Sequence, residues 1–235
     1  MGTGRDGAAR VTFSIAARCA GTGMFGIAVA SSSPAVAARC AHARAGVGVV
    51  ATQNITDPRL GPAGLDLLAS GLAAVDALDR LRAGAAHAEF RQVTLVDRNG
   101  GSAFFSGNRT LGRHGAAEAP GAVAAGNMLA SDTVPQRMVE AFADIGGAAL
   151  GDRLLAAMRA GLDAGGEEGP VHSAGLLLVR DVPWPVADLR VDWTEADPVA
   201  ALAGLWTLWQ PQMDAYVARA LDPADAPGFG VPGAA

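Results

Sequence analysis

The sequence predicts an α+β protein folded as a four-layer αββα sandwich, in which two stacked, mainly antiparallel sheets lie between pairs of helices. The first observation behind this prediction is the order of the expected elements, because blocks of strands alternate with pairs of helices. A doubly wound parallel sheet would alternate single strands with single helices. The second observation is composition: half of the 235 residues are hydrophobic, with a mean hydropathy of +0.24. Such a chain can form one large packed domain.

Three strands are expected near the start of the chain. Residues 12–18 alternate between larger apolar side chains and small or hydroxyl side chains, which is typical of a strand. A glycine-containing turn leads to residues 25–31, which we expect to complete a hairpin. Residues 35–45 are interpreted as a variable connection. The valine-rich residues 46–53 predict a third strand.

A pair of helices and a second hairpin follow. Residues 63–70 and 72–83 carry leucines at helical spacing, and Gly71 separates the two segments. Residues 90–97 and 102–106 are predicted strands joined by an Asn-Gly-Gly turn.

The second half of the chain repeats this order of strands and helices. We expect, in order, a polar glycine-rich loop at 107–121, a buried strand at 122–129, helices from about 132 to 144 and at 150–164, strands at 173–179 and 188–193, and a helix at 198–221 that is interrupted near Pro211. In domain terms, residues 1–11 are predicted to be a leader that is disordered or not part of the true chain. Residues 12–221 are predicted to form a single domain, and 222–235 a loose tail.

Charge and composition exclude several classes of protein. The formal net charge of −5 argues against a nucleic-acid partner. No apolar run is long enough for a membrane span, and the first ten residues lack the apolar region of a secretory signal, so we expect a cytoplasmic protein. All 18 basic residues are arginines, which removes lysine from any mechanism. The scattered histidines and two isolated cysteines predict no metal and no cofactor.

Five sequence runs resemble an uncharacterised bacterial family. They are Thr-Phe-Ser-Ile at 12–15, Ala-Val-Ala-Ser at 28–31, Ala-Gly-Val-Gly-Val-Val-Ala-Thr-Gln at 45–53, Gly-Asn-Met-Leu at 126–129 and Ser-Ala-Gly-Leu-Leu-Leu-Val at 173–179. The family is a domain of unknown function (number 1028) placed with the N-terminal-nucleophile (Ntn) hydrolases, and the resemblance covers roughly residues 11 to 195. It implies the Ntn type of αββα sandwich, also found in proteasome β subunits.

The resemblance implies that Thr12 is a nucleophile whose own α-amine acts as the base, because Ntn hydrolases use the first residue of the mature chain in this way. The unperturbed pKa of an α-amine, near ~8, suits this task. Many relatives start Met-Thr-Phe-Ser-Ile, whereas Val11 stands here in place of that Met. Either Val11 is the product of a misread GTG start codon, or the residues before Thr12 are a propeptide removed by self-cleavage.

Further candidate residues are placed around Thr12 by the same layout. Ser31 and Ser32 are expected to orient the amine, and Asn127 with Gly126 to hold the tetrahedral intermediate. An oxyanion hole is expected from the polar end of the third strand, Thr52, Gln53 and Asn54. His172 and Ser173 begin a strand expected near the nucleophile, although relatives often carry Gln at position 172. Asp57 and Arg59 are candidates for the substrate rim, and Arg44 for binding a substrate carboxylate.

The expected function is cleavage of an amide bond in a small molecule through a threonine acyl-enzyme. The absence of nucleophile-elbow, phosphate-loop and dinucleotide-binding motifs removes the common alternatives. A second interpretation is a non-catalytic αββα protein that binds a ligand or partner and whose threonine is blocked by the leader. Catalysis by Cys19 or Cys40 has little support from spacing. An apolar stripe on the last helix, at Trp206 and Trp209, predicts packing or an interface, and we expect a homodimer or higher homo-oligomer.

Overall fold

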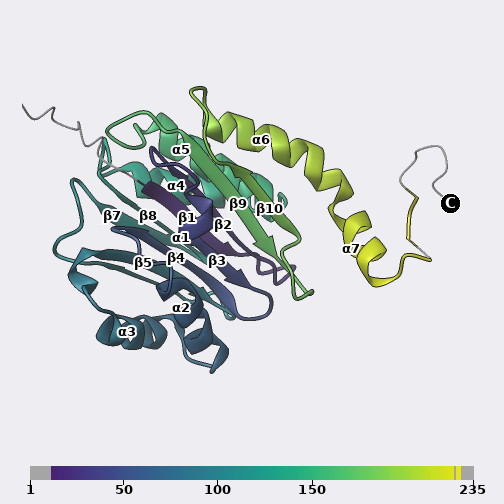
Figure 1. Ribbon diagram of the computed structural model, residues 1–235, viewed down its shortest axis with the longest axis horizontal. Coiled ribbons are helices and arrows are strands. Elements are labelled where there is room, and N and C mark those ends of the chain that lie inside the picture. Colours follow the sequence, from purple (N-terminus) through teal and green to yellow (C-terminus); the bar gives the residue numbers. More distant parts are fainter. Residues whose placement is uncertain (1–11, 225, 229–235) are drawn as a thin grey trace, which may run out of the picture.

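A computed structural model describes residues 12–224 and 226–228 of the chain (Figure 1). Two antiparallel sheets lie face to face, and helices cover the outer face of each sheet. The predicted α+β sandwich with two stacked antiparallel sheets is therefore confirmed. Predictions about residues 1–11 lie outside the described residues.

The larger sheet has six strands in the order β10-β9-β2-β1-β8-β7, and all neighbours in it are antiparallel. Its strands are β1 (Thr12–Arg18), β2 (Phe25–Ser31), β7 (Gly115–Ala119), β8 (Ala122–Asn127), β9 (Ser173–Val179) and β10 (Ala187–Val191). The smaller sheet has the order β3-β4-β5-β6, with β3 (Ala41–Arg44), β4 (Gly48–Asn54), β5 (Arg91–Asp97) and β6 (Ser102–Ser106). Both central strands of the larger sheet, β1 and β2, are buried on both faces, as expected for the middle of a sandwich.

Helices close the two outer faces. The larger sheet is covered by α4 (Val134–Asp144), α5 (Leu150–Asp163) and α6 (Pro198–Trp209), and the smaller sheet by α2 (Leu60–Ala69) and α3 (Ala74–Gly84). Shorter elements are α1 (Ala37–Cys40), the 3-10 turns η1 (Ala88–Phe90) and η2 (Gln210–Gln212), and α7 (Met213–Leu221). The interruption at η2 confirms the predicted break near Pro211. Among the described residues, no helix has the length and apolar character needed to cross a bilayer.

Three apolar layers hold the sandwich together, and β1 contributes to two of them. Phe13 and Ile15 pack with α4 and α5, whereas Ala16 joins Val49 and Ile27 between the two sheets. A third layer lies between the smaller sheet and α2 and α3. The alternation predicted for residues 12–18 is therefore confirmed. All of these described strands, helices and core layers lie between Thr12 and Leu221, so a chain that starts at Thr12 keeps all of them.

Two segments expected to be irregular contain regular structure. The predicted loop at 107–121 includes β7, which pairs with β8, and the predicted connection at 35–45 includes α1 and β3. Strand β7 consists of glycine, alanine and one glutamate, residue types with low strand propensity. Its position at the sheet edge, paired with a strongly apolar strand, outweighs that propensity.

Candidate active site

Four polar side chains form one row across the larger sheet. In the register of β9, β2, β1 and β8, Ser173 lies opposite Ser31, Ser31 opposite Thr12, and Thr12 opposite Asn127. Directly opposed residues have Cβ atoms only about 4.5–5.5 Å apart. Thr12 is 6% exposed and the other three are fully buried. The structure therefore brings together four of the residues singled out from the sequence.

A chain of hydrogen bonds connects the Thr12 hydroxyl to a guanidinium group. Thr12 Oγ1 donates to Ser31 Oγ at 3.3 Å, and Ser31 Oγ lies 2.8 Å from Ser33 Oγ. Arg39 Nη2 donates to Ser33 Oγ at 2.5 Å, and Arg39 Nη1 donates to the carbonyl of Ala35 at 3.1 Å, which fixes the guanidinium. A positive charge at the end of this chain favours negative charge at the hydroxyls.

A cavity of about 430 Å³ opens beside Thr12. Arg39 is the charged residue of its lining, so the cavity presents a positive charge to whatever enters it. The sequence interpretation did not include Arg39, which reaches the cavity only because α1 lies against the ends of β2 and β4. The lining residues are Thr12, Ser33, Arg39, Asn54, Ile55, Thr56 and Leu111.

Amide side chains join the other side of Thr12 to the smaller sheet. Asn127 Nδ2 donates to the Thr12 carbonyl at 3.3 Å and to Gln92 Oε1 at 3.2 Å. Gln53 Nε2 also donates to Gln92 Oε1, at 2.7 Å, and Ser14 Oγ donates to Gln53 Oε1 at 2.7 Å. Gln53 is fully buried in this network between the sheets, so its position fits a structural role better than the oxyanion hole predicted for it.

The remaining residues at the end of β4 shape the cavity wall. Asn54 has a left-handed backbone, with φ of 71°, and its side chain donates to the Phe90 carbonyl at 2.6 Å and accepts from the Leu111 amide at 3.2 Å. Asparagine tolerates this conformation better than most residues. The buried Thr52 hydroxyl donates to the Asp57 carbonyl at 3.3 Å, which holds the chain after β4.

Gly126 allows close packing below Asn127. A Cβ atom at this position would lie 2.5 Å from Leu129 Cδ2, and the Gly126 carbonyl accepts from Gln92 Nε2 at 3.0 Å. The glycine therefore serves the network that positions Asn127.

Ser173 and His172 support the loop that follows β2. Ser173 Oγ donates to the Ser33 carbonyl at 2.6 Å and so fixes the residue that contacts Arg39. The His172 amide donates to the Ser31 carbonyl at 2.9 Å. Its ring is stacked on Trp193, with centroids 4.2 Å apart, and the ring orientation indicates packing.

Neither Arg44 nor Asp57 is among the residues that line the cavity beside Thr12, so the structure does not bring them together with the polar row. Arg44 pairs with Gly48 at the start of β4, about 20 Å from the end of the strand that reaches the cavity. It forms an ion pair with Asp66 at 2.8 Å. Asp57 is held by Arg59, whose two nitrogens donate at 2.9 and 2.8 Å, and these bonds lower the pKa of Asp57 to about 2.

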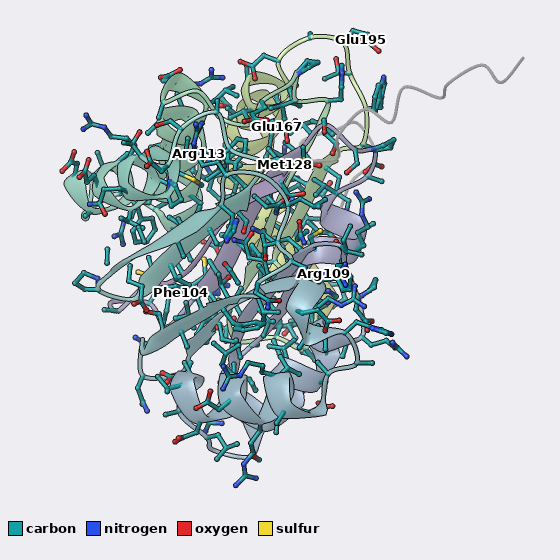
Figure 2. The ribbon with its side chains drawn as sticks, turned by 90° about the vertical axis from the view of Figure 1, so that its left-hand side faces the viewer. Phe104, Arg109, Arg113, Met128, Glu167 and Glu195 are labelled. Carbon is teal, nitrogen blue, oxygen red and sulfur yellow. The ribbon has the colours of Figure 1, made fainter. Side chains whose placement is uncertain are left out.

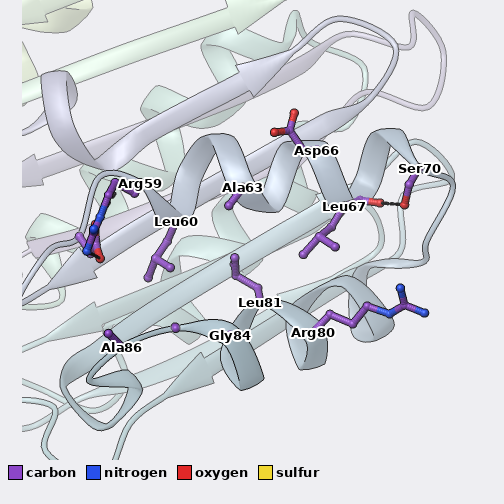
Figure 3. Close-up of a pocket in the computed structure, with 12 residues that line it drawn as sticks. Arg59, Leu60, Ala63, Asp66, Leu67, Ser70, Arg80, Leu81, Gly84 and Ala86 are labelled. Atoms are coloured by element: carbon purple, nitrogen blue, oxygen red, sulfur yellow. Dashed lines mark hydrogen bonds and ion pairs between the residues drawn. The ribbon is translucent and has the colours of Figure 1, made fainter.

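Asp57 borders a different hollow, a groove of about 760 Å³ between α2 and α3 (Figure 3). Leucine and alanine side chains form much of its wall, whereas Arg80 points away along the rim (Figure 3). None of the residues of the polar row around Thr12 lines this groove.

Glu167 is a buried carboxyl group that the sequence interpretation did not single out. Its residue is 4% exposed, and burial raises the pKa of its carboxyl group to about 9, against a smaller opposing effect of the nearby Ser32 hydroxyl and amide. It lies at the end of the larger sheet with Met128 and Arg113, far from α2 and α3 (Figure 2). The sequence feature that could have pointed to Glu167 is its position directly after Gly165 and Gly166, beyond the end of the preceding helix.

Neither cysteine extends this site. Cys40 is 1% exposed, and burial raises the pKa of its thiol. Cys19 lies at the far end of β1, next to the turn that leads to β2. Across the part of the chain that the structure describes, no group of three or more histidine, cysteine or acidic side chains is arranged to hold a metal ion.

Fold and site define an α+β sandwich with a buried threonine at the end of its central strand. A family model, described as "Family of unknown function (DUF1028)", matches residues 12–202, and the chain belongs to this family. A crystal structure of a member from Silicibacter pomeroyi is similar, with 29% sequence identity and a TM-score of 0.78 over 84% of this chain and 88% of that chain. No curated protein matches.

Proposed function

We propose that the protein is an N-terminal-nucleophile hydrolase that cleaves an amide bond in a small molecule, with Thr12 as first residue and nucleophile. The observation that supports this proposal most is the position of the Thr12 hydroxyl. It lies at the wall of a cavity and at the end of the hydrogen-bond chain through Ser31 and Ser33 to Arg39.

The proposed reaction has two steps. Thr12 Oγ1 attacks the amide carbon while its proton passes to the α-amine of Thr12, and collapse of the tetrahedral intermediate breaks the C–N bond as that proton moves to the leaving amine. The resulting ester is attacked by water, which gives its proton to the α-amine. That proton then passes to Thr12 Oγ1 as the bond between Oγ1 and the acyl carbon breaks, so the carboxylic acid leaves and the threonine hydroxyl is restored. Asn127 holds the backbone of Thr12 in place throughout, through the bond to its carbonyl.

The position of Arg39 favours a substrate that carries a carboxylate. Its guanidinium faces the same cavity as Thr12, and a guanidinium binds carboxylates with two parallel hydrogen bonds. We therefore expect an amide that carries a carboxylate, such as an N-acyl amino acid.

A panel of N-acyl amino acids and their uncharged amides tests the proposal. The chain starting at Thr12 is incubated with each compound, and released amino acid is measured. Turnover should disappear in Thr12→Ala and persist in Thr12→Ser, which keeps a hydroxyl. Full turnover by Thr12→Ala would exclude the proposed nucleophile.

A further inference from the structure

The loop that carries Glu167 is bound to the end of β8. Residues 165–166 are glycines with left-handed φ of 114° and 57°, which turn the chain back after α5. Glu167 then forms an antiparallel bridge with Leu129, and the Glu168 amide donates to the Met128 carbonyl at 3.0 Å. Figure 2 shows Glu167 and Met128 together at this end of the molecule.

The loop that carries Glu167 lies next to the amino end of β1. Strands β2 and β8 flank β1 on opposite sides and run antiparallel to it, and the last residue of each pairs with Thr12. Ser32 follows β2, Leu129 follows β8, and these two strands are about 9–10 Å apart, twice the spacing of neighbours. Glu167 is close to Ser32 and bridged to Leu129, so it lies between the ends of the two strands that flank Thr12.

Buried acceptors at this place are incompletely matched. Among the described residues, both carboxylate oxygens of Glu167 and the side-chain oxygen of Asn127 are buried and have no partner at hydrogen-bond distance, and the nearby Ser32 hydroxyl and amide offset only part of the cost of burying the Glu167 carboxyl group. The orientation of the Asn127 amide is fixed, because a flip would place its oxygen against two other acceptors, the Thr12 carbonyl and Gln92 Oε1. Buried polar groups without partners are rare and require an explanation.

The guanidinium group of Arg113 is engaged elsewhere. Arg113, which lies at the same end of the molecule as Glu167 (Figure 2), donates to the carbonyls of Leu129 and Ala130. The neighbouring Glu168 is exposed and adds no positive charge. Arg113 therefore supplies no donor to these acceptors, and a cationic donor would satisfy them.

We propose that Glu167 is the counter-ion that binds and orients the α-amine of Thr12. The inference rests on the proposed function, in which Thr12 is the first residue of the chain. A protonated α-amine has three N–H donors and one positive charge, which match the Glu167 carboxylate and the Asn127 oxygen. Glu167 is thus a positioning residue that holds the amine beside Thr12 Oγ1.

The absence of lysine makes this proposal directly measurable, because the α-amine is the one primary amine of the sequence. In a chain that starts at Thr12, the rate of acetylation by acetic anhydride is followed from pH 5 to 10 by mass spectrometry of the N-terminal peptide. Glu167→Gln should lower the pKa of the α-amine by about 1–3 units, since an opposite charge is lost. The matched control Glu168→Gln, an exposed neighbour with the same charge change, should leave it unchanged.

Equal α-amine pKa values in the wild type and in Glu167→Gln would overturn the proposal. Thermal melting checks that the variant is folded, and Glu167→Asp, which keeps the charge on a shorter side chain, should give an intermediate pKa. In the full chain the α-amine is ten or eleven residues from Thr12 along the sequence, and Glu167→Gln should not change its pKa there. Labelling needs no turnover, so its result is independent of whether Thr12→Ala abolishes hydrolysis.

Discussion

The groove between α2 and α3 and the cavity beside Thr12 differ most in the side chains that line them. The larger groove, between α2 and α3, has apolar walls, and its acidic residues are paired: Asp57 with Arg59, and Asp66 with Arg44. The smaller cavity has a buried hydroxyl and a guanidinium connected through serines. Catalytic chemistry is therefore expected where polar groups are buried and oriented, and the volume of a hollow is a poor guide to it.

The same contrast holds within the polar end of the larger sheet. The side-chain donors and acceptors of Gln53 and Gln92 are hydrogen-bonded to each other and to residues of both sheets. The carboxylate of Glu167 has no such match among the described residues. Matched buried groups stabilise the fold, whereas unmatched ones indicate a place for a ligand or a charged terminus.

Substitutions in the cavity beside Thr12 and in the groove between α2 and α3 should differ most strongly in their effect on amide hydrolysis. Thr12→Ala should lower amide hydrolysis by on the order of 10³-fold or more, because the nucleophile is removed. Arg80→Ala, at the rim of the groove between α2 and α3, should change it less than about twofold. Initial rates on one N-acyl amino acid compare the two variants. A large loss in Arg80→Ala would move the site to the groove.

The matched network should contribute to stability. Gln92→Leu removes the partner of Gln53 and Asn127 at nearly constant volume, and we expect the free energy of unfolding to fall by about 1–3 kcal/mol. Gln136→Leu changes an exposed glutamine on α4 and should cost less than about 0.5 kcal/mol. Urea denaturation measures both. An equal cost for the two variants would show that the network contributes little.

Removal of the guanidinium should weaken substrate binding. Arg39→Ala should lower kcat/KM for N-acyl amino acids by roughly tenfold or more, the effect of one lost charge-assisted hydrogen bond of about 1.5–3 kcal/mol. Uncharged amides should be affected less. Arg59→Ala, an arginine of the other hollow, is the control, and a similar loss for both classes of substrate would argue against carboxylate recognition.

Glu167 should make the stability of the full chain depend on pH. Its folded pKa, about 9, is above its ordinary value of 4.5, so the folded state binds the proton more tightly. The resulting stabilisation is complete below about pH 4.5 and is lost as the pH rises toward 9. Glu167→Gln has no titrating group at this position and does not lose this stabilisation. The Tm of the variant minus the Tm of the wild type should therefore increase by a few degrees from pH 5 to pH 9. A constant difference in Tm would contradict the raised pKa.

The contribution of Asp57 to stability should depend on pH in the opposite direction, and its effect should be the smallest. Its pKa is lowered from 3.8 to about 2 by the bonds from Arg59, so its stabilisation is present above about pH 4 and is lost as the pH falls through 2. Arg59 is 83% exposed, and Asp57→Asn should therefore cost less than about 1 kcal/mol at pH 7. Thermal melting at pH 7 and pH 2.5 should show the difference shrinking at the lower pH, and a larger cost at pH 2.5 would contradict this sign.

Strongly patterned segments were predictable from the sequence. The bounds predicted for β1, β2 and β9 agree with the structure, because these central strands are apolar and end in turn residues. The hydroxyl residues at their ends, Thr12, Ser31 and Ser173, therefore share one row of the sheet.

Residues that reach the site through tertiary packing were not predictable. Arg39 depends on a one-turn helix docked beside β4, Gln92 on the stacking of the two sheets, and Glu167 on a loop bridged to Leu129. None of these contacts has a signature in local periodicity. Residue type alone pointed to Arg44, and the antiparallel register places it on β3 opposite Gly48, at the end of β4 that is remote from the cavity.

The most direct test of the central claim is the reaction of the chain starting at Thr12 with a β-lactone, which opens when a hydroxyl attacks it and leaves an ester of known mass. We expect one adduct, which peptide mapping locates at Thr12, which hydroxylamine cleaves as it does an ester, and which is absent from Thr12→Ala. No adduct at Thr12, or an identical ester in Thr12→Ala, would contradict the assignment of Thr12 as the nucleophile.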